Sequence, residues 1–245
     1  MNKLGFGGLG LSVVLALVAG CGDDSGSTGT GGGGTGGEAA TTGATTTTGG
    51  EGGAGTTTGN GGAGGGGEVA PDLTGQFASG CLAVPQQDGS TQYISLTFDN
   101  TEADWAIDYV VHGDDQCASD FIAVRIEGPY ALTAPSSVVD GAWDGDFKFT
   151  KRTVTPGNDM ATGFLSSLQG CGDGNFVTGM PTDIHTTGCL PLGQYPVADC
   201  SQDYDIAKLE NGGDVLRFGT RPADNNMCTA DKRPTELSPV MFMKQ

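Results

Sequence analysis

The segment YISLTF, at Tyr93–Phe98, decides the fold class of this 245-residue chain. Every second side chain from Ile94 is apolar, and the side chains between them are Tyr, Ser and Thr. This is the period of a β-strand that turns one face to a core. The following segment WAIDYVV, at 105–111, repeats the period with apolar side chains at every second position from Trp105. The two segments together predict an all-β domain.

Further alternating segments continue along the chain to its end. A first strand opens at Gly75-Gln76-Phe77, and Gly128-Pro129 is expected to end the strand that starts at Phe121. The remaining strands are expected at Trp143–Val154, Asn175–Met180, Tyr204–Glu210, Asp214–Gly219 and Pro239–Met243. Eight or nine strands separated by turn residues predict an antiparallel β-barrel, closed or nearly closed, over residues 68–245. A β-sandwich is the alternative.

One segment has the period of a helix instead. Met160, Phe164, Leu165 and Leu168 fall on one face at helical spacing. Thr155-Pro156 supplies a start signal and Gly170 a stop signal, so a single short helix is expected between them.

The N-terminal segment is typical of an exported protein. It has a basic residue, Lys3, an apolar stretch at 9–18, and Val-Ala-Gly directly before Cys21. The apolar stretch is shorter than the roughly 20 residues of a membrane-spanning helix, and the whole pattern describes a secretory signal. A cut site before a cysteine resembles the lipobox of bacterial lipoproteins. That resemblance implies a signal peptide at 1–20 and a Cys21 anchored by fatty acyl chains such as palmitate.

Residues 21–67 consist almost entirely of Gly, Thr, Ala and Ser after the cysteine. No packed face can form from this composition, so a disordered linker with a mean span of about 35–40 Å is expected. Gly22 stands where an aspartate retains some lipoproteins on the inner membrane. The resemblance therefore implies a location in the bacterial cell envelope, on the outer membrane, facing the periplasm or the surface.

The net charge restricts the class of partner, and the cysteines indicate disulfides. A net charge of −18 repels nucleic acid and anionic headgroups, which disfavours both as partners. Apart from Cys21, an even number of cysteines in an exported domain predicts disulfides, and their spacing fits no zinc motif. The sequence allows fifteen pairings. We expect pairing between neighbours in order, Cys81–Cys117, Cys171–Cys189 and Cys200–Cys228.

Residue types that carry out catalysis are sparse. The two histidines are His112 and His185, and no Gly-x-Ser-x-Gly elbow or metal-binding histidine motif accompanies them. Acidic pairs such as Asp203/Asp205 are expected by chance in so acidic a chain. We therefore predict no enzymatic activity, no metal site and no cofactor.

Several short motifs together resemble a known family. They are Gly75-x-Phe77, Cys81, Tyr93, Asp115-x-Cys117, Leu168-Gln169-Gly170-Cys171-Gly172, Leu216-Arg217-Phe218-Gly219 and Arg233-Pro234-Thr235-Glu236-Leu237. This order is similar to that of the barrel domain of the adenomatosis polyposis coli down-regulated family, from about Asp72 to Gln245. The resemblance implies a lipocalin-like barrel, whose animal relatives bind acyl chains of lipid-modified signalling proteins. Phe77 stands where tryptophan is usual, and the chain has one such domain.

Six side chains are candidates to line a cavity in this barrel, and a core packed without a cavity is the alternative for each. They are Trp105, Ile107, Tyr109, Val111, Phe147 and Phe149. A hollow barrel would bind a hydrophobic or acyl-bearing ligand. A filled barrel would instead be a structural or adhesive module that contacts another envelope protein.

Overall fold

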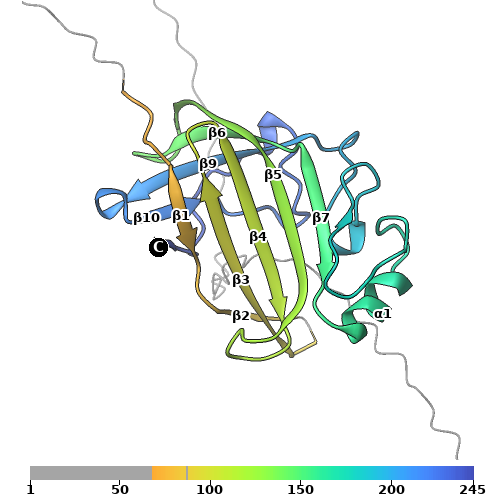
Figure 1. Cartoon of the computed structure of the whole chain (residues 1–245). Coiled ribbons are helices and arrows are strands. Elements are labelled where there is room, and N and C mark those ends of the chain that lie inside the picture. The colour runs from red at the N-terminus through yellow and green to blue at the C-terminus, as the bar shows by residue number, and fades with distance from the viewer. Residues whose placement is uncertain (1–67, 87) are drawn as a thin grey trace, which may run out of the picture. The chain divides into compact units, whose positions relative to one another are not determined.

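The computed structural model describes residues 68–86 and 88–245 (Figure 1). The predicted signal peptide at 1–20, the lipidated Cys21 and the linker at 21–67 lie outside the described residues. None of the described helices is both long enough and apolar enough to cross a membrane.

The described residues form mostly strands. These are β1 (Gly75–Ala78), β2 (Leu82–Pro85), β3 (Thr91–Asn100), β4 (Asp104–His112), β5 (Asp120–Pro135), β6 (Trp143–Lys148), β7 (Lys151–Pro156), β8 (Thr182–Asp183), β9 (Gln202–Glu210), β10 (Val215–Phe218) and β11 (Phe242–Lys244). The described helices are α1 (Asp159–Ser167) and the 3-10 turns η1 (Leu190–Leu192), η2 (Asn211–Gly213) and η3 (Ala230–Lys232).

Eight antiparallel strands close into a barrel, which confirms the predicted fold and excludes the sandwich. The ring runs β1-β3-β4-β5-β6-β9-β10-β11 and returns to β1. Figure 1 shows β3, β4 and β5 side by side on one wall, with β7 and then α1 beyond them. Closure leaves the ring without an unpaired edge, so the inward faces of all eight strands share one interior.

Strand β5 does not end at Gly128-Pro129, contrary to the sequence prediction. It is 16 residues long, and the two residues mark the place where it changes partner. Residues 122–127 pair with β7, and residues from Tyr130 onward pair with β6. The strand continues because β4 pairs with it on the other side across the change, with Gly128 opposite Trp105.

The long strand predicted at Trp143–Val154 is also wrong, because it is interrupted between β6 and β7. Tyr130 pairs with Phe147 and Glu127 pairs with Lys151, so residues 148–150 oppose only Gly128 and Pro129. The extra residue is a β-bulge, and a shift of one residue exchanges the two faces of a strand. After the bulge, the even-numbered residues of β7 are therefore the ones that face the interior.

The segment predicted as a strand at Asn175–Met180 is a loop between α1 and β8. Its backbone turns twice, with Gly174 and Gly179 at positive φ and the Met180 amide donating to the Val177 carbonyl 3.0 Å away. Two short strands that the sequence pattern did not indicate extend the ladders beyond the ring: β2 pairs with β3, and β8 pairs with β7.

The predicted helix is present but begins later than predicted, and three of the four apolar residues of its pattern, Phe164, Leu165 and Leu168, pack on the core. Asn158 caps α1 by accepting a hydrogen bond from the Ala161 amide at 2.9 Å, whereas Pro156 ends β7. Ala161 and Leu165 are its buried side chains, while Met160 is 72% exposed. The first apolar residue of the helical pattern therefore lies on the solvent side.

Three disulfides join the cysteines in the expected order, Cys81–Cys117, Cys171–Cys189 and Cys200–Cys228. The last two lie in the segment between α1 and β11, which contains long irregular stretches. Cys171, Cys189 and Cys200 are buried within the hydrophobic core. Cys171–Cys189 therefore joins two irregular segments to each other, and Cys200–Cys228 joins the chain just before β9 to the loop after β10.

The partner change at Gly128 generates a prediction. An alanine Cβ there would lie 2.1 Å from the Lys148 carbonyl oxygen, a distance that forces the backbone to move. We expect Gly128→Ala to lower the free energy of unfolding by about 3 kcal/mol, measured by urea denaturation. Gly163→Ala in α1 is the matched control, because nothing lies within 4 Å of the position that its Cβ would take. That variant should gain about 0.5–1 kcal/mol, and equal stability of the two variants would contradict the steric argument.

Candidate functional site

A cavity of about 110 Å³ lies within the barrel. Its walls are mainly aromatic and aliphatic and come from β3, β4, β5, β6, β7, β9, β10 and β11 and from the loops beside them. The apolar lining side chains are Leu96, Phe98, Trp105, Ile107, Val124, Ile126, Phe147, Phe149, Phe218, Val240 and Phe242. Ile107 and Ile126 face the interior directly opposite each other on β4 and β5, yet both are only half-buried. Their exposed surface indicates open space beside them.

Five of the six predicted lining residues border this cavity: Trp105, Ile107, Tyr109, Phe147 and Phe149. Val111 does not border it and is buried in the surrounding core. The Trp105 ring packs edge-on against the Phe147 ring, with centroids 5.3 Å apart, and its indole N–H donates to the Lys148 carbonyl at 3.1 Å. These contacts fix the orientation of the Trp105 ring in one wall of the cavity. Binding of a ligand by the six residues stays a prediction.

The cavity is small for a ligand site. Ordinary small-molecule pockets measure roughly 300–1,000 Å³, whereas an engineered cavity of about 150 Å³ binds benzene. The volume of this cavity, about 110 Å³, is close to that of the cavity that binds benzene. The barrel is thus neither filled nor as hollow as a typical carrier, and its space suits a short apolar group.

One wall of the cavity carries charge, and Arg152 of β7 is its most buried member. The residue is 2% exposed and borders the cavity. Its guanidinium lies over the Phe149 ring at 4.0 Å from the centroid. It donates to the backbone carbonyls of Tyr195 and Cys200, the latter at 2.8 Å, while its Nε atom is buried without a partner. Burial lowers the pKa of Arg152 to about 10, so the side chain stays charged at neutral pH.

Two carboxyl groups from β9 lie at the same wall. Asp203 forms an ion pair with Arg221. Asp205 is 6% exposed, and its Oδ1 accepts hydrogen bonds from the backbone amides of Ile206 at 2.7 Å and Gly219 at 2.9 Å. Burial raises the pKa of Asp205 to about 7, and the nearby Arg221 charge only partly opposes this. Near neutral pH the Asp205 carboxyl is therefore about half protonated.

Sequence reasoning missed Arg152 for a specific reason. In an uninterrupted strand from Trp143, alternation places Phe147 and Phe149 on one face and Arg152 on the other. The bulge between β6 and β7 exchanges the faces, so Arg152 joins Phe149 at the cavity. Asp203 and Asp205 did carry a signal, because they alternate in phase with Ala207, which is fully buried.

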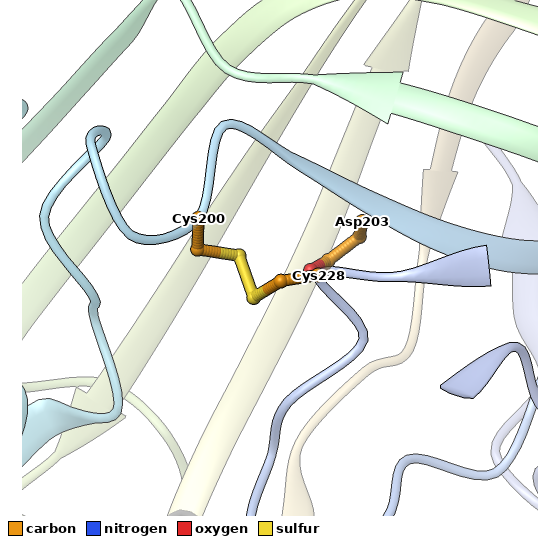
Figure 2. Close-up of side chains that lie close together, drawn as sticks. All are labelled: Cys200, Asp203 and Cys228. Atoms are coloured by element: carbon orange, nitrogen blue, oxygen red, sulfur yellow. A yellow bond between two sulfur atoms is a disulfide. The ribbon is translucent and has the colours of Figure 1, made fainter. Parts of the chain in front are cut away.

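Cys200, Asp203 and Cys228 place ligand-type atoms close together, as in a metal site. Figure 2 shows the two sulfur atoms bonded to each other and the Asp203 carboxylate beside them. A disulfide offers no thiolate to a metal, and the Asp203 carboxylate is engaged by Arg221. The oxidised cluster therefore lacks the donors that a metal ion needs.

A second polar cluster lies away from the cavity. The Ser95 hydroxyl is 2.8 Å from Nε2 of His112, and an Asp120 carboxylate oxygen is 3.2 Å from Nδ1, outside hydrogen-bond geometry. These are the residue types of a nucleophile–base–acid set. None of the three borders the cavity, and the His112 side chain is 5% exposed. The cluster sits where the β4–β5 register shifts, and we interpret it as fixing that irregularity. The absence of enzymatic activity stays a prediction.

No protein-family model matches this sequence, and no curated protein matches it significantly. The resemblance to the adenomatosis polyposis coli down-regulated family therefore rests on the short motifs. The aromatic residue of the first motif, Phe77, lies in β1 and is fully buried. Its side chain belongs to the hydrophobic core of the barrel.

The raised pKa of Asp205 generates a prediction for stability. A carboxyl whose pKa is higher in the folded state favours folding while it is protonated. That contribution is complete below about pH 4 and is lost as the pH rises through about 7. Asparagine can accept both amide hydrogen bonds without ionising. We expect the free energy of unfolding of Asp205→Asn, relative to the parent, to rise by up to about 4 kcal/mol between pH 4 and 8.

The control is Asp224→Asn, an exposed carboxyl whose pKa the Lys232 ammonium lowers. The free energy of unfolding of Asp224→Asn, relative to the parent, should not rise with pH. Urea denaturation across the pH range measures both variants. If the free energy of unfolding of Asp205→Asn, relative to the parent, does not change with pH, the Asp205 carboxyl has an ordinary pKa.

Proposed function

We propose that this chain is a lipid-anchored lipoprotein of the bacterial cell envelope whose barrel binds a hydrophobic or acyl-bearing ligand. One observation carries the proposal, the cavity whose apolar lining comes from β3, β4, β5, β6, β10 and β11 and their ends. The half-buried side chains of Ile107 and Ile126 inside it offer apolar surface that a ligand would remove from water.

The size of the cavity sets the strength of such binding. Each buried methylene group contributes about 0.8 kcal/mol, so a group of three or four methylenes contributes about 3 kcal/mol. Apolar contact alone therefore supports weak binding by a short chain or by the end of a longer one. Anchoring offsets this weak binding, because a barrel held near the membrane meets ligands there at a high effective concentration.

The anchor itself rests on the sequence before the described residues. A short apolar segment followed by Cys21 supports lipidation, and the Gly- and Thr-rich residues 21–67 support a flexible tether. Two or three acyl chains hold a protein stably at a membrane, whereas one does not. The net charge of −18 argues against nucleic acid as a partner.

Filling the cavity should abolish binding. In Ile107→Phe the larger ring would occupy the open space, so saturable binding of hexanamide, an uncharged six-carbon probe, should be lost in an NMR titration. The matched control is Val110→Phe, on the same strand but with an outward-facing, half-buried side chain that does not border the cavity. It should bind as the parent does. If the parent binds no apolar probe, the binding proposal fails and the alternative, a structural or adhesive module that contacts an envelope protein, is favoured.

Lipidation is tested at the anchor residue. Cys21→Ser should abolish incorporation of an alkyne-tagged palmitate during expression in a bacterium with the lipoprotein-processing enzymes. It should also move the protein from the membrane to the soluble fraction, because no acyl chain is attached. The parent chain is the reference in the same host. A serine variant that stays labelled would contradict the assignment of Cys21.

A further inference from the structure

We propose that Arg152 receives the carboxylate of the ligand, so that the barrel binds an amphiphilic monocarboxylate whose apolar part enters the cavity. This inference rests on the proposed apolar binding and specifies the chemistry of the ligand. It begins with the cost of a buried charge. A cation removed from water destabilises a protein unless an anion and hydrogen bonds compensate it.

The compensation for Arg152 is incomplete in the described part of the chain. Among residues 68–86 and 88–245, no carboxylate oxygen lies within 4.0 Å of its guanidinium. The two hydrogen bonds go to neutral backbone carbonyls, those of Tyr195 and Cys200. The Nε–H group, buried and without a partner, remains a free donor. A group of this kind at a cavity wall is suited to an anionic acceptor.

The neighbouring acids compensate this charge only in part, although the Asp203 carboxylate opposes the lowering of the Arg152 pKa by burial. Asp203 directs its carboxylate to Arg221 at an ion-pair contact. Asp205 uses one carboxyl oxygen on two backbone amides, and burial holds its pKa near 7. Below neutral pH the wall therefore carries two guanidinium charges against one full carboxylate charge. The remaining positive charge fits a single carboxylate on the ligand.

The position of Arg152 relative to the apolar surface defines the rest of the ligand. Its guanidinium is held over the Phe149 ring, and Phe149 packs with Trp105 at a centroid distance of 6.1 Å. A carboxylate at Arg152 thus places the attached carbon chain against aromatic side chains of the cavity. The volume of about 110 Å³ restricts the inserted part to a short chain or a single ring.

The test compares hexanoate with hexanamide, two probes of nearly the same shape that differ in charge. The full chain carrying Cys21→Ser is used, so that no detergent competes for the cavity. At about pH 6, where hexanoate is ionised, we expect hexanoate to bind about 10- to 100-fold more tightly than hexanamide by NMR titration. The Arg152 Nε–H resonance should shift with hexanoate and stay in place with hexanamide. Arg152→Lys identifies that resonance by its disappearance.

Arg152→Gln completes the test. It should reduce the affinity for hexanoate to that for hexanamide, because the carboxylate loses its partner. Equal affinity of the parent for both probes would overturn the carboxylate site and leave apolar binding intact. A hexanoate preference without a shift at Arg152 Nε–H would also overturn it, even if Arg152→Gln fails to fold. Absence of binding by both probes would refute the apolar function itself, and the carboxylate site with it.

Discussion

The close approach of Gly128 to the Lys148 carbonyl oxygen organises this barrel. Where the two backbones meet, β5 passes from one partner strand to the other, and a bulge inserts one residue between β6 and β7. Only glycine leaves room for that contact. The ring then closes through β6 and β9, while β7 continues outside the ring toward β8. The bulge also decides which side chains of β7 face inward, and so it places Arg152 at the cavity.

The charged wall has a cost that packing does not explain. A barrel of this size can be filled with apolar side chains alone, and replacing buried ion pairs by such side chains is often neutral or stabilising. This barrel instead encloses Arg152, Asp203 and Asp205, each less than 10% exposed. The pKa values of Arg152 and Asp205 are shifted by burial, and buried groups of this kind at the wall of a cavity are typical of binding sites. The cost to folding is understandable if the charges serve recognition of a ligand.

The disulfides stabilise the irregular part of the chain. The segment from α1 to β11 contains two long irregular stretches, yet it supplies fully buried side chains such as Ile184, Leu192 and Met227. Such a segment gains few ladder hydrogen bonds, and disulfides limit the conformational freedom of its unfolded state. Cys200–Cys228 also joins the start of β9 to the loop beyond β10, close to Asp203. The covalent framework therefore supports the charged wall of the cavity as well as the fold.

The sequence by itself indicated the β-class and most of the apolar lining, because period-two alternation reports which side chains are buried. It favoured a barrel over a sandwich and allowed fifteen cysteine pairings, of which the structure shows the one between neighbours in order. It misjudged places where the backbone departs from regular repetition. The strand continued through Gly128-Pro129 because its ladder with β4 runs across the change of partner. Residues 175–180 form a loop, with Gly174 just before them and Gly179 within them at positive φ. Tertiary structure alone decided the inward face of β7, since a single bulged residue exchanges the faces and leaves no mark in the alternation. The buried arginine and the chemistry of its cavity follow from that residue.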